Sequence, residues 1–231
     1  MKAIKTILAV CLLSLTTAAN AQKTYVHISY NGTQYDFASD GIALMTMDTK
    51  ASIGKGSAKA TINGAEVDVT WVQLWKDGPK FATMNLGATS IPASGNTYTW
   101  TESDSATDAA TVNWGSNWKV PTQTDMNELY LAASEDGSSD KVSCTYTTYT
   151  EGGSDYGFLF KGKTAGYTGN SLFFPANSTD KNKGVLYYWS GTMSTAEYGQ
   201  SLSLHYENDN WYSMWVQAAK TIEHCVRPVL K

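Results

Sequence analysis

The side chains best suited to nucleophilic, acid–base or metal chemistry are three histidines and the two cysteines that follow residue 21. They are His27, His205, His224, Cys144 and Cys225. Catalytic and metal sites need several such groups at one place. His205 lies in an alternating, strand-like segment and His224 directly precedes Cys225, so neither has the spacing of a metal-ligand motif. The sequence also contains no Gly-x-Ser-x-Gly motif. We therefore predict a protein that is not an enzyme and that uses no cofactor or metal.

The segment Glu207-Asn208-Asp209-Asn210-Trp211 places oxygen-rich side chains beside an aromatic ring. Calcium-dependent sugar binding would use such residues, but calcium needs about six to eight oxygen ligands. The same residues are ordinary in a polar turn that joins two strands, here at 202–206 and 211–215. A turn is the favoured interpretation, and a calcium or sugar site is the alternative.

Aromatic side chains crowd the last quarter of the chain, at Tyr187, Tyr188, Trp189, Tyr198, Tyr206, Trp211, Tyr212 and Trp215. Rigid rings with polar neighbours make contact surfaces at a small entropic cost. We therefore predict a ligand-binding surface composed of Tyr206, Asn208, Asp209, Asn210, Trp211 and Tyr212. The alternative is that strand alternation buries Trp211 and Trp215 and leaves Tyr212 outside with the 208–210 tip.

A first β-hairpin is predicted around Asn31-Gly32, which separates two alternating segments. A two-residue type I′ loop at this position would pair Ile28 with Tyr35 on one face. It would also set His27 opposite Asp36, which gives this histidine a structural explanation.

A second hairpin is predicted around Asn63-Gly64. Counting outward from this loop pairs Ala60 with Val67 and Lys59 with Asp68, on alternate faces of the hairpin.

One helix is predicted after Pro121. Thr122 can cap its N-terminus, and Asp125 can complete an acidic capping box. Apolar side chains then follow with helical spacing at Met126, Leu129, Tyr130 and Ala133. Strands are predicted at Val142 to Tyr149, Phe158 to Lys161, Leu172 to Phe174, Val185 to Trp189, Leu202 to Tyr206, Trp211 to Trp215 and His224 to Val229. One helix among many short strands indicates an α+β or mainly β fold.

The first residues have the pattern of a cleavable secretory signal. Lys2 and Lys5 precede an apolar segment from Ile7 to Leu15, and Ala19-Asn20-Ala21 has the small-x-small pattern of a cleavage site. A lipoprotein signal ending at Cys11 is the alternative. We expect cleavage near Ala21 and a secreted, periplasmic or outer-surface protein.

The expected organisation is a signal peptide at 1–21, an N-terminal β-hairpin module at 22–60 and a larger domain at 61–231. A third strand is expected from Ile42 to Met47, and the small polar segment Lys50 to Ser57 is expected to be a linker.

The charge of the chain argues against anionic partners. Loss of Lys2 and Lys5 takes the 17 basic residues to 15, against 21 acidic residues, for a formal charge of −6. The lysines are scattered, whereas binding of nucleic acid requires clustered basic residues. After the signal, no segment approaches the roughly 20 apolar residues that span a bilayer. We expect neither nucleic-acid binding nor a transmembrane segment.

Cys144 and Cys225 allow a single intramolecular pairing in an oxidising compartment, and we predict a disulfide between them. Such a bond would add about 4 kcal/mol in the chain-entropy model. The alternative is two separate buried thiols.

Five segments occur in a characteristic order over roughly residues 66–231. They are Phe81-Ala82-Thr83-Met84-Asn85-Leu86-Gly87-Ala88, Trp114-Gly115-Ser116-Asn117-Trp118-Lys119-Val120-Pro121-Thr122, Leu172-Phe173-Phe174-Pro175-Ala176, Tyr187-Tyr188-Trp189-Ser190 and Val226-Arg227-Pro228-Val229-Leu230. Together these segments resemble the Fibrobacter succinogenes major paralogous domain family of exported proteins from Bacteroidetes and related bacteria.

This resemblance implies a C-type-lectin-like fold, shared with the core of formylglycine-generating enzymes, in which the two ends of the domain pair. The chain departs from the family pattern at Lys119, where an arginine is common, and at residues 97–102. The enzymes of this fold use a cysteine-based copper site, for which Cys144 and Cys225 are the candidates after the signal. The composition of Ser201 to Trp215 also fits segments that retroelements diversify in some lectin-like proteins.

We therefore expect a non-catalytic secreted or cell-surface protein that binds a glycan or a protein. A structural component of the envelope and an enzyme of unknown reaction are the alternatives.

Overall fold

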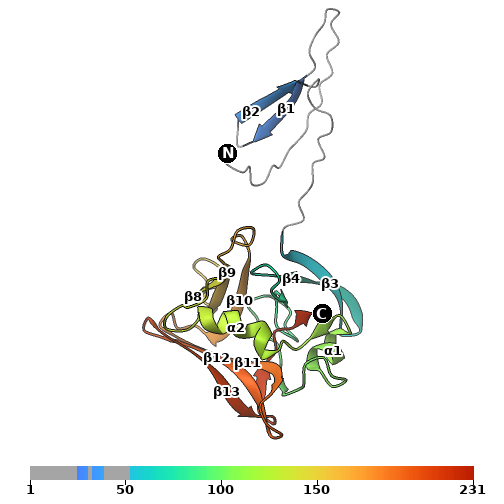
Figure 1. Ribbon diagram of the computed structural model, residues 1–231, viewed down its shortest axis with the longest axis vertical. Coiled ribbons are helices and arrows are strands. Elements are labelled where there is room, and N and C mark those ends of the chain that lie inside the picture. Colours follow the sequence, from blue (N-terminus) through green and yellow to red (C-terminus); the bar gives the residue numbers. More distant parts are fainter. Residues whose placement is uncertain (1–24, 31–32, 39–52) are drawn as a thin grey trace, which may run out of the picture. The chain divides into compact units, whose positions relative to one another are not determined.

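The computed structural model describes residues 25–30, 33–38 and 53–231, and Figure 1 shows their helices and strands. The chain divides into two compact units, Met1–Thr49 and Lys50–Lys231. Strands dominate the described residues and two helices accompany them, so the fold is mainly β within the α+β class. This confirms the α+β, mainly β part of the prediction.

In the first unit, β1 (Tyr25–Tyr30) pairs antiparallel with β2 (Thr33–Ala38). Ile28 lies opposite Tyr35 and His27 lies opposite Asp36. This register confirms the prediction from the Asn-Gly dipeptide. The predicted signal at 1–21 and the predicted strand at 42–47 lie outside the described residues.

The second hairpin consists of β3 (Lys55–Ile62) and β4 (Ala65–Val72). Lys59 lies opposite Asp68, as predicted, and Lys59 Nζ is 3.3 Å from Asp68 Oδ2. Both residues of the loop at 63–64 have positive φ, the geometry of a type I′ turn.

This second hairpin belongs wholly to the second unit. Because β3 begins at Lys55, the expected module end at residue 60 falls inside this strand, and the expected linker at 50–57 overlaps its start. Gly56 in this segment has a packing role. A Cβ at Gly56 would lie 2.6 Å from Cζ2 of Trp71, so the glycine leaves room for the indole across the sheet.

Five strands form the sheet that contains this hairpin, in the order β3-β4-β5-β15-β7. The additional strands are β5 (Lys80–Ala82), β7 (Trp118–Lys119) and β15 (Val229–Leu230). Val229 pairs with both Phe81 and Lys119. The C-terminal strand is therefore held between two strands from the first half of the unit.

Two other sheets of this unit contain β6 and the strands from β8 to β14. One has the order β10-β9-β8, with β8 Val142–Thr148, β9 Tyr156–Gly162 and β10 Ser171–Ser178. The other has the order β13-β12-β11-β14-β6, with β6 Thr97–Thr99, β11 Lys183–Met193, β12 Tyr198–Glu207, β13 Asn210–Ala219 and β14 Glu223–Cys225. The single strand predicted at 224–229 is two strands, β14 and β15, which belong to different sheets. Pro228 between them has no N–H for a continuous ladder.

Helix α2 (Gln123–Ala132) confirms the predicted helix and its cap. The Thr122 hydroxyl accepts from Asp125 N at 3.1 Å, and Asp125 Oδ2 accepts from Thr122 N at 2.8 Å. Met126 and Leu129 are fully buried. The apolar face of α2 therefore packs on the larger of two hydrophobic cores.

A second helix, α1 (Ala109–Trp114), was not predicted. With six residues it is too short for a clear apolar period. Its N-cap is Asp108, a buried side chain whose Oδ1 accepts from Thr111 N at 2.9 Å. No helix among the described residues is long and apolar enough to cross a membrane.

Arg227, the chain's one arginine, is buried where the sheets meet. Its Nη1 donates to Ala82 O at 3.2 Å in β5, and its Nη2 donates to Phe173 O at 2.8 Å in β10. The guanidinium also lies 4.6 Å from the ring centroid of Phe174. One side chain therefore joins two sheets by hydrogen bonds to their carbonyl groups.

The predicted disulfide between Cys144 and Cys225 is wrong, because both residues are free thiols. Cys144 lies in β8 opposite Phe160, whereas Cys225 lies in β14, in another sheet, and donates to Ser94 O at 3.6 Å. Burial raises the pKa of both thiols. They therefore contribute little thiolate at neutral pH.

Candidate functional site

The six predicted binding residues lie together at the β12–β13 hairpin, but its two faces separate them. Glu207 pairs with Asn210, and Asn208 and Asp209 between them have φ of 50° and 66°. This is a two-residue type I′ turn. Tyr206 and Trp211 lie on the face that packs on the core, while Tyr212 lies on the opposite face.

On the core side, the rings of Tyr206 and Trp211 pack against the larger hydrophobic core. Tyr206 stacks on Tyr146 with a centroid distance of 4.5 Å, and Trp211 contacts Phe158 edge-on at 5.9 Å. The Tyr206 hydroxyl donates to Asp209 Oδ1 at 2.6 Å. This arrangement matches the alternative in which alternation turns the tryptophan inward.

The oxygen-rich tip is a turn whose carboxylates have partners within the chain. Glu207 Oε1 is 3.2 Å from Lys183 Nζ, and Asp209 accepts from Tyr206. The Asn210 amide donates to the carbonyl groups of Glu207 and Asn208. Across the described residues, no group of three or more His, Cys, Asp or Glu side chains could hold a metal ion. The arrangement favours the turn over the calcium site.

The opposite face of this sheet gathers side chains that the sequence does not bring together. Helix α2 packs against β11, β12 and β13 from the core side, as Figure 1 shows. The other face carries Tyr187, Tyr212 and Met214, whose exposed fractions are 41%, 50% and 47%. Strand register makes them neighbours, since Ser203 of β12 lies between Tyr187 and Met214. We call this surface, with His205 and His224, the outer sheet face.

The two histidines of the outer sheet face are each held by a serine and by Tyr187. Ser203 Oγ lies 2.7 Å from His205 Nε2, and Ser201 Oγ lies 2.8 Å from His224 Nδ1. The ring of Tyr187 lies 5.9 Å from that of His205 and 5.2 Å from that of His224. This fixes the imidazoles beside the exposed tyrosine.

These serine–histidine pairs do not form a nucleophile that a substrate could reach. Ser201 and Ser203 are both fully buried. Ser201 Oγ also donates to Tyr188 O at 3.2 Å. No hydrogen bond or ion pair to either imidazole from a described carboxylate is present, so the third member of a triad is lacking there. The pairs serve to orient the rings.

We expect His205 and His224 to make the protein less stable in mild acid. Burial lowers the pKa of His205 and of His224 below the ordinary 6.5. As the pH falls through 6.5, the imidazoles of the unfolded chain take up protons first, so the unfolded state gains stability. The contribution of these histidines is therefore present above pH 6.5 and is lost as the pH falls through their lowered pKa values. We expect a lower urea midpoint at about pH 5.5 than at about pH 7.5. The double variant His205→Gln, His224→Gln should show a weaker pH dependence, and an unchanged dependence would contradict this assignment.

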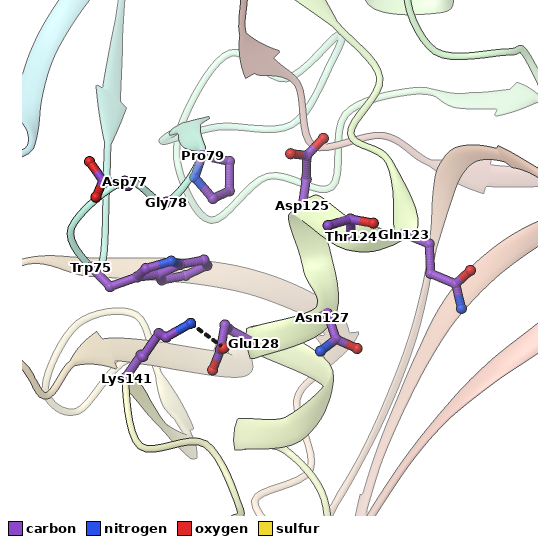
Figure 2. Close-up of a pocket in the computed structure, with 10 residues that line it drawn as sticks. All are labelled: Trp75, Asp77, Gly78, Pro79, Gln123, Thr124, Asp125, Asn127, Glu128 and Lys141. Atoms are coloured by element: carbon purple, nitrogen blue, oxygen red, sulfur yellow. Dashed lines mark hydrogen bonds and ion pairs between the residues drawn. The ribbon is translucent and has the colours of Figure 1, made fainter.

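A concave region of about 590 Å³ lies at the start of α2 (Figure 2). It is lined by Trp75, Asp77, Gly78, Pro79, Gln123, Thr124, Asp125, Asn127, Glu128 and Lys141. Three of these side chains are acidic and one is basic, so the pocket suits a neutral or cationic ligand rather than an anion.

Two of the three carboxylates of this pocket, Glu128 and Asp125, form hydrogen bonds and ion pairs within the protein. Glu128 accepts from Lys141 Nζ at 2.8 Å and from Ser139 Oγ at 2.6 Å. Burial would raise the pKa of Glu128, but Lys141 and Ser139 outweigh it and lower this pKa. Asp125 caps α2 and lies 3.7 Å from Lys119. The pocket is therefore weaker as a candidate than the outer sheet face.

Comparison of the chain with protein-family models, with curated proteins and with solved structures found no match. The function of the chain is therefore inferred from its own residues.

Proposed function

We propose that this chain is a non-catalytic, secreted or cell-surface protein that binds a glycan or protein ligand through the outer sheet face. The observation that carries the proposal is the exposure of Tyr187, Tyr212 and Met214 on one face. His205 lies on the strand between them, and His224 lies beside Tyr187 on the next strand. Soluble proteins rarely leave several large apolar side chains exposed side by side unless something binds there.

Of the two ligand classes, the chemistry of this face favours a neutral glycan. Sugar rings present C–H groups that stack on the faces of aromatic rings, and their hydroxyl groups pair with tyrosine hydroxyls and imidazoles. The formal charge of −4 for the whole chain disfavours a polyanion. A protein ligand is the alternative, since methionine is common at adaptable protein contacts.

The family resemblance supports a C-type-lectin-like domain, which we propose for the second unit. The segments that carry the resemblance supply core residues: Phe81, Leu86, Trp118, Val120, Phe174, Tyr188, Trp189, Val226 and Val229 are all buried. The pairing of β15 with β5 supports the expected pairing of the domain ends. Export is proposed from the signal pattern alone.

The proposal predicts that the outer sheet face is required for binding. In a glycan array probed with residues 22–231, we expect the double variant Tyr187→Ala, Tyr212→Ala to lose at least about tenfold in affinity, because each ring is a large exposed contact. Tyr198→Ala is a matched control, since Tyr198 is 39% exposed on another part of β12. Binding should not require calcium, because the carboxylates of the tip have partners within the chain.

Equal loss in the control, or full binding by the double variant, would contradict the proposed site. A parallel screen of surface proteins would test the alternative ligand. If the chain bound a protein and no glycan, the proposed site would stand and the ligand would be a protein. Binding by the double variant that is lost on mutation of Trp75 would move the site to the pocket at α2.

A further inference from the structure

Strand β13 is the edge of its sheet, and it is unusually open to pairing (Figure 1). It contains ten residues and pairs with β12 along its whole length without a bulge. Its sequence, Asn-Trp-Tyr-Ser-Met-Trp-Val-Gln-Ala-Ala, has no charge and no proline. Natural edge strands normally carry charged residues or proline, which prevent association with other strands.

The other edges of this unit are better protected or shorter. β3 carries Lys55 and Lys59, and β10 contains Pro175 with a break in register after it. β6 has three residues and β7 has two. β8 is also uncharged, but it has only seven residues. β13 is therefore the longest edge that lacks protection.

The register of the hairpin fixes which backbone groups of β13 point away from β12. Glu207 and Asn210 flank a two-residue turn and form a hydrogen-bonded pair, after which bonded and non-bonded pairs alternate. The N–H and C=O groups of Trp211, Ser213, Trp215 and Gln217 therefore point outward. Among the described residues, no backbone hydrogen bond joins these groups to another segment.

We infer that β13 pairs with β13 of a second copy of this chain, antiparallel about a two-fold axis at Met214. The outward-pointing residues are placed evenly around Met214, so Trp211 would face Gln217 and Ser213 would face Trp215 of the other copy. Four such pairs would exchange about eight hydrogen bonds. Both copies would use the same surface, as a two-fold interface requires.

The side chains of β13 also suit this register. On the outer sheet face Tyr212 would lie opposite Val216, and Met214 opposite Met214, all apolar pairs. No like charges would meet along the ten residues. The two outer sheet faces would become parts of one continuous sheet, but the dimer itself does not depend on the proposed ligand.

Covalent capture tests this register. Residues 22–231 carrying Met214→Cys should form a disulfide-linked dimer under mild oxidation, because directly opposed residues of a non-bonded antiparallel pair have Cα atoms about 4.5 Å apart, within disulfide reach. Val112→Cys is the matched control, since Val112 is 66% exposed on α1. Cys144 and Cys225 are partly buried in every variant.

Sedimentation over a wide range of concentrations, without any ligand, gives the second measurement. We expect the unaltered chain to reach the mass of a dimer, and Met214→Lys to stay monomeric at the same concentrations, because two lysines would face each other at the axis. Val112→Lys should behave as the unaltered chain. A monomer at all concentrations, or capture of Met214→Cys no faster than that of Val112→Cys, would overturn the inference. A monomer with strong hydrogen-exchange protection of outward β13 amides would also overturn it, and would indicate that another segment of the same chain covers the edge.

Discussion

Replacing Arg227 with alanine should lower the free energy of unfolding by about 4 kcal/mol, the largest effect that we expect from a single substitution. The change removes a fully buried side chain and leaves a cavity where it lay beside Phe174. It also leaves Ala82 O and Phe173 O without the donor that now joins their sheets. Urea unfolding followed by tryptophan fluorescence would measure the loss.

Two further variants separate the causes. Arg227→Met restores most of the volume without the hydrogen-bond donors, so it should recover only part of the stability. Lys220→Ala removes a cation 4.2 Å from the ring centroid of Trp100 at a less buried place, and should cost less than about 1 kcal/mol. An Arg227→Ala variant no less stable than Lys220→Ala would show that the buried guanidinium contributes little.

Replacing Asp108 with alanine should cost about 3 kcal/mol or more, because one buried carboxylate satisfies three backbone N–H groups. Its Oδ1 accepts from Thr111 N at 2.9 Å at the start of α1. Its Oδ2 accepts from Asp104 N at 2.8 Å and from Val120 N at 2.9 Å. The side chain therefore ties α1 to the loop before it and to the strand end after it. Thermal unfolding would measure the effect.

Asp108→Asn keeps one acceptor oxygen and should fall between the alanine variant and the unaltered chain. Thr122→Ala, at the N-cap of α2, is the matched control, and it should cost about 1 kcal/mol because the hydroxyl bonds only to Asp125 within the same helix turn. If Asp108→Ala cost no more than Thr122→Ala, the carboxylate would be an ordinary cap rather than a junction between segments.

The register of β12 and β13 divides the predicted binding residues between the two faces of the sheet. Tyr212 is exposed on that face, whereas Trp211 points to the core. Composition marked the hairpin as rich in aromatic residues, but the direction of each ring depends on which face of β12 and β13 meets α2. Tyr187 joins the face through strand pairing with β12. His224 joins it through β14, which pairs with β11.

Features that depend on a few neighbouring residues could be read from the sequence alone. The Asn63-Gly64 loop set the register of its hairpin because its φ angles favour asparagine and glycine. Thr122 and Asp125 marked the start of α2 because the capping bonds lie within one turn. The apolar pattern likewise located the strands after α2, although it did not place their ends.

Features that depend on distant segments were decided only by the tertiary structure. Cys144 and Cys225 are free because their strands belong to different sheets, which the sequence does not state. The predicted strand at 224–229 is divided between two sheets, and Arg227 within it donates to carbonyls of residues far away in the chain. The order of strands sets which side chains meet, and it follows from the packing of the whole core rather than from any local pattern.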